Sequence, residues 1–390
     1  MSFNYPLNIN NFTLTDRLKI GWFLLNSKNR WTQDSQVKKI EEEFAKFVGA
    51  KYAVFVSSGS TANTLLAMYL KDTTEVERNI VVLPSLTWAT SVSPFIREGF
   101  TPVFLDISFK DMSLSLYKLE RYLKENHKKV AAVFITSLLG FAPDIQKIQR
   151  LSDLYKVKIM LDNCESTLTQ DSQGCNLSGQ FTSTTSTYFG HNIQSIEGGF
   201  IFTNIDREYE YFIMGRNHGM TRGLDYGVKS KYRNFEVDSR FDFCLLGNNF
   251  RNTDLNAFIG LLDFKRRYHY IQRRKELYKV FQETLDKDKF ILPEYKEGDV
   301  PFSLPIIANE SDCCLRAKQF CLRKKIETRP IISGFLGYQK AFKPFFNKSN
   351  SFSKEYKNAI KFDNCGFYIG LYSKLENCKI QQIAKEINKL

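Results

Sequence analysis

The sequence predicts an α/β fold in which a large, mostly parallel α/β/α part precedes a smaller α+β part. Three observations favour this class. Short apolar runs alternate with amphipathic segments over the first 162 residues, as strands and helices of a parallel sheet do. Small or acidic residues follow several of these runs, at the strand ends where sites in such sheets collect. Beyond about residue 250, short strands and helices mix irregularly.

The first elements follow from hydrophobic spacing. Residues 36–48 are expected to form a helix, because apolar side chains recur there at helical intervals and Gly49 provides a stop. The apolar run 52–56 predicts a buried strand. The small-residue turn 57–63 then leads into a helix that includes 65–68. This succession of strand, turn and helix is the repeating unit of the fold.

The same pattern predicts the elements that follow. Strands are expected at 80–83, 101–105, 130–136 and 158–161, with helices at 89–97 and 144–155. Residues 254–285 indicate one long or broken helix. The chain is therefore divided into an N-terminal segment (1–30), a large α/β domain (31–255), and an interdomain helix with a small C-terminal α+β domain (256–390).

The composition indicates a globular chain with a substantial core. Of 390 residues, 43% are hydrophobic and 14% aromatic, too apolar for a disordered protein. The net charge is +13. The basic residues are scattered or lie in short helical runs, such as 265–267, 273–275 and 323–325, which we interpret mainly as solvated helix faces. They form no nucleic-acid recognition element, whereas a nucleotide-linked small molecule would suit the positive field.

The cysteines and histidines indicate the cellular location and whether a metal site is expected. The eight cysteines form no CxxC or CxC pair, and the N-terminus has no charged segment leading into an apolar one. No apolar stretch is long enough to span a membrane. These features predict a cytoplasmic protein with reduced thiols and no membrane attachment. The four histidines show no metal-ligand spacing, so no metal site is expected.

Three places carry possible chemistry. The turn 57–63 places small and hydroxyl residues at a helix N-terminus, which suits a phosphate, although an ordinary serine N-cap is an alternative. Trp88 follows a strand and loop, so it either stacks on a planar ring or belongs to the core. Asp162 ends an apolar strand. If buried, its carboxylate needs a cationic partner; otherwise it caps the following helix.

The most informative segment runs from Ser186 to Asn192 and is followed by Glu197–Gly198–Gly199. His191 lies five residues after Ser186, and the nearest downstream lysine is Lys229. Alone, His191 is an unremarkable polar loop residue. Its neighbours in the sequence change that interpretation.

The ordered motifs resemble the DegT-type family of nucleotide-sugar aminotransferases and dehydratases. This resemblance extends from about Trp31 to the C-terminus, and its matching stretches are GAKYAVFVSSGSTAN, Trp88, LDNCES, STYFGHNIQSIEGG, RNHGM, GNNFRNTDLNAFIGLL and ETRPIISG. Members are pyridoxal 5′-phosphate (PLP) enzymes with the aspartate aminotransferase fold (fold type I). The resemblance therefore implies that fold, with 31–255 as the cofactor-binding domain.

The resemblance assigns roles to individual residues. Gly59, Ser60 and Ser186 are expected to hold the cofactor phosphate, Trp88 to stack on the ring, and Asp162 to pair with the pyridinium nitrogen. That pairing makes the ring an electron sink.

The remaining roles also follow from the resemblance. Glu165 is expected to act beside the cofactor, and His218 and Arg329 to contact the substrate. The family site lies at a homodimer interface, so Asn249 is expected to reach the phosphate of the neighbouring subunit.

His191 departs from the usual family pattern, which has lysine at this position. The histidine branch resembles 3-dehydratases of nucleotide-linked 4-keto-6-deoxy sugars. One sub-branch acts on CDP-sugars and carries an iron–sulfur cluster held in part by a CxC pair, which this chain lacks. The other sub-branch, the GDP-4-keto-6-deoxymannose 3-dehydratases, uses pyridoxamine phosphate (PMP) and L-glutamate and is the closer match.

We therefore expect a lyase of deoxysugar and lipopolysaccharide biosynthesis. Glutamate would convert PLP to PMP, and His191, which cannot tether the cofactor covalently, would act as the base during loss of the C3 hydroxyl. Three alternatives stay open: an aminotransferase, another PLP enzyme such as a decarboxylase, and a catalytically silent binding protein. The nucleobase, sugar configuration, amino donor and any reductase partner also stay open.

Overall fold

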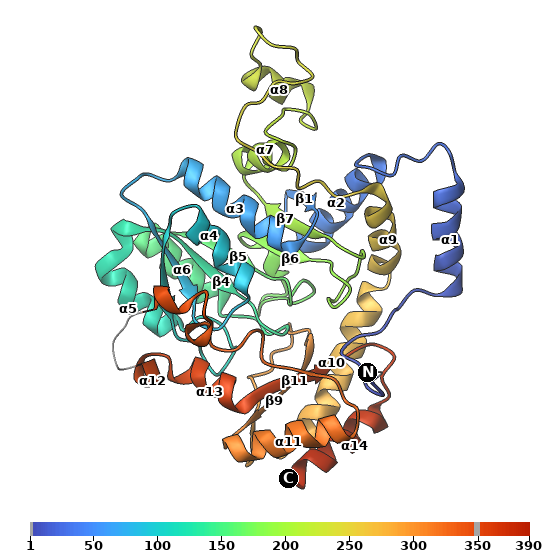
Figure 1. Ribbon diagram of the computed structural model, residues 1–390, viewed down its shortest axis with the longest axis vertical. Coiled ribbons are helices and arrows are strands. Elements are labelled where there is room, and N and C mark those ends of the chain that lie inside the picture. The colour runs from blue at the N-terminus through green and yellow to red at the C-terminus, as the bar shows by residue number, and fades with distance from the viewer. Residues whose placement is uncertain (1–2, 347–351) are drawn as a thin grey trace.

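A seven-stranded sheet forms the centre of the computed structural model, which describes residues 3–346 and 352–390 (Figure 1). Its spatial order is β1-β7-β6-β5-β4-β2-β3. All neighbouring pairs from β6 to β3 are parallel, whereas β7 is antiparallel to both β1 and β6. The strands are β1 (Tyr52–Val56), β2 (Ile80–Pro84), β3 (Thr101–Leu105), β4 (Val130–Thr136), β5 (Lys158–Asp162), β6 (Thr182–Ser186) and β7 (Gly199–Thr203). The predicted mostly parallel α/β class is confirmed.

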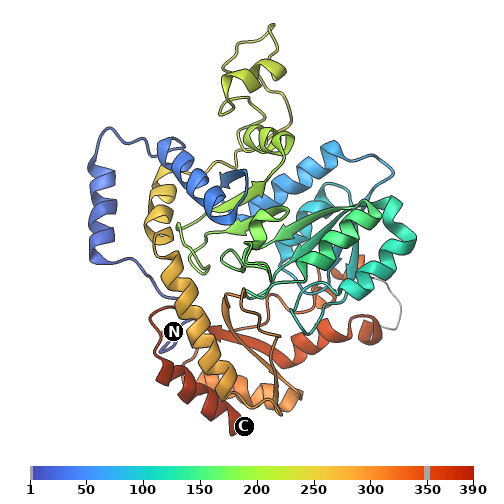
Figure 2. The same ribbon diagram turned by 180° about the vertical axis from the view of Figure 1, so that it is seen from behind.

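Helices cover both faces of this sheet (Figures 1 and 2). The predicted helix 36–48 is confirmed as α2 (Ser35–Val48), which buries Phe44 and ends at Gly49 in the left-handed conformation. The predicted helix 89–97 is divided into a 3-10 turn at Ala89–Ser91 and the short α4 (Ser93–Arg97), with Pro94 near the start of α4. Other helices of this part are α3 (Gly59–Thr73), α5 (Leu116–Asn126), α6 (Ile145–Tyr155) and α7 (Asp206–Gly215).

Strand β6 contains no apolar residue, yet all five of its side chains are buried. Hydrogen bonds within the core compensate for the polarity of three of these residues, whereas the buried Thr185 hydroxyl has no partner among the described residues. Thr182 donates to Glu208, Ser183 donates to the Ser178 carbonyl at 2.8 Å, and Thr184 donates to Asn63 at 2.6 Å. Because each of these buried hydroxyls has a partner, it avoids the cost of desolvation without a hydrogen bond.

A second, antiparallel sheet organises the C-terminal part in the order β10-β11-β9-β8. The predicted helix 254–285 is broken after Phe264 into two helices that lead from one sheet to the other (Figure 1). The elements are α9 (Asp254–Phe264), α10 (Arg267–Thr284), β8 (Phe290–Ile291), β9 (Ser303–Ala308), α11 (Ser311–Arg323), β10 (Thr328–Arg329), α12 (Phe352–Glu355), α13 (Lys357–Cys365), β11 (Gly366–Gly370) and α14 (Asn377–Asn388).

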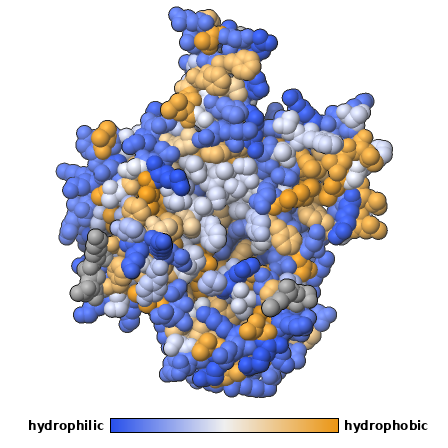
Figure 3. Space-filling model, viewed as in Figure 1, coloured by the Kyte–Doolittle hydropathy of each residue, from blue (hydrophilic) through white to orange (hydrophobic). Residues whose placement is uncertain are grey.

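Two segments project from this body. The arm between α7 and α9 carries α8 (Tyr226–Tyr232) and extends away from the sheet in both ribbon views. Helix α1 (Leu14–Leu25) packs the Phe23 ring against Phe258 of α9, at 4.6 Å between centroids. Its outer face exposes Trp22 and several leucines, and the surface at that edge is apolar in Figure 3. Among the described helices, none is both long and apolar enough to cross a membrane.

The carboxylate of Asp254 joins the starts of two helices. It accepts hydrogen bonds from the backbone N–H groups of Asp34 (2.7 Å), Gln36 (3.0 Å) and Val37 (3.0 Å). Asp254 is 2% exposed, so water cannot replace these bonds if the carboxylate is lost. The side chain therefore fixes the N-terminus of α2 against that of α9.

We expect Asp254→Ala to lower the free energy of unfolding by about 2–4 kcal/mol, because it leaves three backbone donors without their acceptor. Urea unfolding followed by circular dichroism measures this loss. Asp312→Ala, at an exposed position in the first turn of α11, is the control and should cost less than about 1 kcal/mol. Equal effects of the two substitutions would contradict the proposed role of Asp254.

Candidate active site

A cleft of about 810 Å³ lies where the carboxyl ends of the large-sheet strands face the second sheet. Thr136, Asp162 and Ser186 are the last residues of β4, β5 and β6. Phe302 and Tyr368 enter from the opposite side. Of the predicted site residues, the cleft brings together Gly59, Ser60, Trp88, Asp162, Glu165, Ser186, His191 and Arg329.

Asp162 is 3% exposed and is held in a fixed orientation. Its Oδ2 accepts hydrogen bonds from Ser91 Oγ at 2.6 Å and Asn63 Nδ2 at 2.9 Å, while Oδ1 accepts from the Cys164 N–H at 3.1 Å. Within residues 3–346 and 352–390, no basic side chain forms an ion pair with it. A buried carboxylate in a cleft wall is thus available to a cationic ligand.

The start of α3 in the cleft wall suits a phosphate. Ser58 and Thr61 form a capping box at the start of α3, which occupies the Thr61 N–H and leaves those of Gly59 and Ser60 without intrahelical partners. A Cβ atom at Gly59 would lie 2.9 Å from Cys164 Sγ and 3.0 Å from Ser186 Cβ. Only glycine fits here, so the helix start lies close against the end of β6.

Trp88 lines the cleft beside this helix start and is 53% exposed. It is therefore not a core aromatic, and one of its faces is available to a planar ring. The Ser60 hydroxyl lies 2.9 Å from that of Thr90, which fixes the loop after Trp88 against α3. The exposed indole therefore lines the same cleft as the helix start and the Asp162 carboxylate.

The His191 loop closes one wall. The His191 N–H donates to the Tyr188 carbonyl at 2.9 Å, and the imidazole lies against Phe302, at 5.5 Å between ring centroids. Its Nδ1 is buried without a partner among the described residues. Burial lowers the pKa of His191 to about 4, with the positive charge of Arg274 acting in the same direction. The imidazole is therefore neutral at pH 7 and can accept a proton.

Glu165 lies three residues beyond Asp162, also in the cleft wall. Its Oε2 accepts a hydrogen bond from the Leu139 N–H at 2.9 Å. Burial raises the pKa of Glu165 to about 7, and the nearby charge of Asp162 adds to this effect. Near neutral pH the carboxyl group therefore exchanges a proton readily, unlike an ordinary glutamate.

The N-terminal segment forms part of the same wall. Leu7 and Asn8 line the cleft, and Asn8 Nδ2 donates to the Phe189 carbonyl in the His191 loop at 2.7 Å. Three residues earlier, the Tyr5 hydroxyl donates to the Gly370 carbonyl of β11 at 2.8 Å. This segment thus ties the His191 loop to the second sheet.

Three predicted site residues lie elsewhere or at the edge. Asn249 is exposed, and neither it nor His218 lines the cleft of its own chain. Arg329 lies at the cleft rim, where its side chain is 58% exposed and pairs with Glu327 at 3.2 Å. The substrate and subunit roles of these residues stay predictions.

Sequence interpretation missed several polar residues of the cleft. Asn63 and Ser91 hold Asp162; Asn63 lies in the predicted turn 57–63, but nothing in the sequence indicates this role for either residue. Arg274 was included in a basic run interpreted as a solvated face; that interpretation is wrong for this residue, which is 5% exposed and lines the cleft. Its spacing from the buried Tyr270 and Tyr278 of α10 was the available signal, since residues four apart share a helix face.

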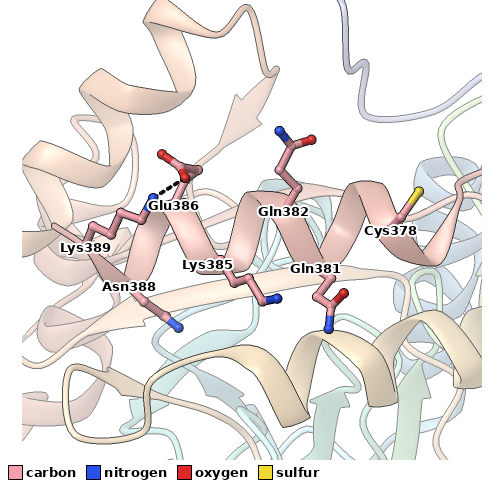
Figure 4. A pocket seen from close by; sticks show the side chains of 7 residues that line it. All are labelled: Cys378, Gln381, Gln382, Lys385, Glu386, Asn388 and Lys389. Atoms are coloured by element: carbon pink, nitrogen blue, oxygen red, sulfur yellow. Dashed lines mark hydrogen bonds and ion pairs between the residues drawn. The ribbon is translucent and has the colours of Figure 1, made fainter.

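A second hollow, of about 480 Å³, lies on the surface of α14 (Figure 4). Its lining side chains come from that one helix and from Lys389, which follows it, and Figure 4 shows them pointing to different sides of the helix. No other element contributes a polar group to this surface. The large cleft is therefore the candidate active site.

The cleft residues fit PLP. The α3 N-terminus and Ser186 suit its phosphate, the exposed indole of Trp88 suits its ring, and the unpaired Asp162 carboxylate suits a protonated pyridine nitrogen. No lysine is among the described residues that line the cleft. A cofactor bound here would therefore be held by noncovalent contacts.

Comparison with known proteins agrees with this assignment. The chain is 29% identical over 356 residues to the GDP-4-keto-6-deoxy-D-mannose 3-dehydratase of Yersinia pseudotuberculosis, covering 88% of each chain. The E. coli enzyme of that name, solved with bound hydrated PLP, superimposes with a TM-score of 0.89 at 24% identity, covering 99% of this chain and 100% of the other. This fold likeness confirms the predicted aminotransferase fold.

Another similar structure is a GDP-4-keto-6-deoxymannose-3-dehydratase with a trapped PLP-glutamate geminal diamine. Its TM-score is 0.87 at 25% identity, covering 98% of this chain and 100% of that chain. The model of the DegT/DnrJ/EryC1/StrS aminotransferase family matches residues 24–388. The chain therefore belongs to the DegT/DnrJ/EryC1/StrS aminotransferase family.

Proposed function

We propose that this chain is a PLP/PMP-dependent 3-dehydratase that removes the C3 hydroxyl of a nucleotide-linked 4-keto-6-deoxyhexose, with GDP-4-keto-6-deoxymannose as the first candidate substrate. L-Glutamate is the amino donor. The relatives named above, which match along nearly the whole chain, support this substrate. The product is a 3-deoxy sugar for surface polysaccharides, in agreement with a lipopolysaccharide biosynthesis protein of Salmonella typhimurium that is 27% identical.

The observation that carries the proposal is the presence of His191, and of no lysine, in the described cleft wall. A lysine would hold the cofactor covalently and return a proton to the sugar as transamination requires. A neutral imidazole accepts and donates protons but forms no such link. The site therefore favours elimination over amine transfer to the sugar.

The atoms and electrons of the reaction balance without a further reductant. The sugar loses the oxygen atom of its C3 hydroxyl and is reduced by two electrons. Glutamate is oxidised by two electrons to 2-oxoglutarate, and its nitrogen leaves as ammonia. Water lost from C3 is matched by water taken up when the amine is released from C4.

Different residues of the cleft carry out the separate steps of this reaction. The cofactor supplies an amine for the C4 ketone and a ring that takes up electrons. His191 moves the proton at the C4′ carbon of the cofactor. Asp162 keeps the ring nitrogen protonated through its buried carboxylate. Glu165, whose pKa is raised to about 7 by burial, is the second group able to exchange a proton near the departing C3 hydroxyl.

We further propose a homodimer with shared sites, in which Asn249 reaches the cofactor phosphate of the neighbouring subunit and His218 and Arg329 contact the sugar nucleotide. The exposure of Asn249 outside its own cleft supports this arrangement. We also propose a cytoplasmic location, which the eight free cysteines of the chain support.

The direct test is to incubate the protein with PLP, glutamate and GDP-4-keto-6-deoxymannose and to determine the product mass. The expected product lacks one oxygen atom, and 2-oxoglutarate forms in equal amount. Borohydride treatment of the purified protein should attach no cofactor to a side chain. An amino sugar as the main product would favour an aminotransferase instead.

We expect His191→Asn to lower kcat by about 10²–10⁴-fold, the usual contribution of a general base, while PLP absorbance shows that the cofactor still binds. His269→Asn, at an exposed position of α10, should leave kcat unchanged. His191→Lys should restore a borohydride-reducible link and shift products toward the amino sugar. Dehydration products alone from the lysine variant would contradict the role of His191.

The substitution Glu165→Gln keeps an acceptor for the Leu139 N–H but replaces the ionisable carboxyl group by an amide that does not titrate. Because burial raises the pKa of Glu165 to about 7, its contribution to wild-type stability is fully present below the ordinary glutamate pKa and is lost as pH rises through 7. We therefore expect the cofactor-free variant to gain on the order of 2 kcal/mol over wild type between pH 4.5 and 8. Urea unfolding across this range measures the gain, with exposed Glu43→Gln as control. A constant difference would contradict the raised pKa.

The shared site predicts complementation between inactive subunits. Co-expressed His191→Asn and Asn249→Ala chains form mixed dimers in which one of the two sites is intact, and random pairing makes half of the dimers mixed. Activity should return to about a quarter of the wild-type value, although each variant alone is impaired. Lack of recovery in isolated mixed dimers would contradict the shared site.

A further inference from the structure

Arg274 is a buried cation in the cleft wall that forms no ion pair with any residue in 3–346 or 352–390. It lies on α10, is 5% exposed and lines the cleft close enough to His191 to lower the pKa of that imidazole. Burial lowers the pKa of Arg274 to about 10, so the guanidinium remains charged at neutral pH. Burying such a charge is costly unless an anion compensates it.

The hydrogen bonds of Arg274 use only part of its guanidinium. Nη1 donates to the backbone carbonyls of Pro301 at 3.2 Å and Phe302 at 2.7 Å. Among the residues described, none accepts a hydrogen bond from Nε or Nη2, and no carboxylate lies within ion-pair distance. Tyr270 and the charge of Asp263 oppose the lowering of the Arg274 pKa, but the Asp263 carboxylate is itself bound by Tyr270 and the Gln194 N–H. The two carbonyls thus fix the guanidinium while leaving donors for a ligand.

We propose that Arg274 binds the α-carboxylate of the amino donor, an inference that rests on the proposed function. The donor carries this carboxylate on the same carbon as its reacting amine, so its anion must lie near the group that moves the proton. Arg274 borders His191 in the cleft, whereas Arg329 lies at the exposed rim and pairs with Glu327. A planar guanidinium with free donors is the side chain that pairs best with a carboxylate.

The position also explains how one cleft serves two successive ligands. Glutamate has carboxylates and no large group, so it depends on a cation deep in the cleft. A nucleotide-linked sugar carries its charge on a diphosphate beyond the hexose ring, which places that charge toward the rim. Arg274 therefore acts in the step that loads the cofactor with nitrogen, and the deoxygenation step does not require its free donors.

The test separates the two half-reactions. Arg274→Gln and Arg274→Lys proteins are loaded with PLP, and conversion to the PMP form is followed by absorbance at increasing glutamate. We expect the half-saturating glutamate concentration to rise by about 10- to 100-fold in Arg274→Gln, with a smaller rise for Arg274→Lys. Arg273→Gln is the control, because Arg273 pairs with Glu276 outside the cleft. A wild-type glutamate dependence in Arg274→Gln would overturn the proposal.

Supplying PMP directly bypasses glutamate. The same Arg274→Gln protein, loaded with PMP, should convert the sugar nucleotide in a single turnover within a few-fold of the wild-type rate. Loss of both half-reactions to the same degree would overturn the proposal, since it indicates a structural role alone. If wild-type protein loaded with PMP does not deoxygenate the sugar, the proposed function fails while the glutamate titration still reports on Arg274.

A binding measurement needs no turnover. Calorimetric titration of the PLP-loaded protein with glutarate, a dicarboxylate that has no amine and cannot react, should show binding that Arg274→Gln weakens by about 10-fold or more. A second comparison uses the conversion of PLP to PMP. In wild type, 4-aminobutyrate, which has no α-carboxylate, should half-saturate this conversion at a higher concentration than glutamate does. Arg274→Gln should remove this difference. A difference of the same size in both proteins would overturn the assignment of the α-carboxylate.

Discussion

The fixed carboxylate of Asp162 is the interaction on which the site depends. Its partners come from three separate elements: Asn63 from α3, Ser91 from the 3-10 turn, and the Cys164 N–H beyond β5. Asn63 in turn accepts from Thr184 of the polar strand β6. Through these bonds the carboxylate at the end of β5 fixes the start of α3 relative to β6. Because its partners are neutral, the negative charge stays available to the cofactor.

Much of this arrangement was predictable from the sequence, and the exceptions have physical causes. Apolar runs identified β1 to β5, and the motifs indicated residues that the structure brings together in one cleft, because strand ends and glycine turns have local signatures. Strand β6 carries no apolar residue, so hydrophobic periodicity does not reveal it; only its hydrogen-bonding partners do. Arg274 was missed for a related reason, since a charged residue in a basic run resembles solvent-facing helix surface until its burial is known. The domain boundaries stay predictions.

The cleft wall contains two buried charges of opposite sign. Asp162 is a buried anion that suits a cationic ring, and Arg274 is a buried cation that suits an anionic ligand. Both charges influence the pKa of His191, in opposite directions, and burial keeps this imidazole neutral. Among the described residues neither charge has an ion-pair partner, so both are costly to bury and ligands of opposite charge would reduce this cost. The free energy of cofactor and donor binding is therefore linked to the stability of the folded chain.

The path of the first few residues affects how the smallest working unit is defined. The family model begins at residue 24, yet the Asn8 side chain donates a hydrogen bond to the His191 loop and the Tyr5 hydroxyl donates one to β11. A recombinant fragment trimmed to the family boundary would keep every strand of both sheets and still have a gap in the wall behind the imidazole. The boundary of the family model therefore does not coincide with the boundary of the cleft, whose wall also includes the N-terminal residues Leu7 and Asn8.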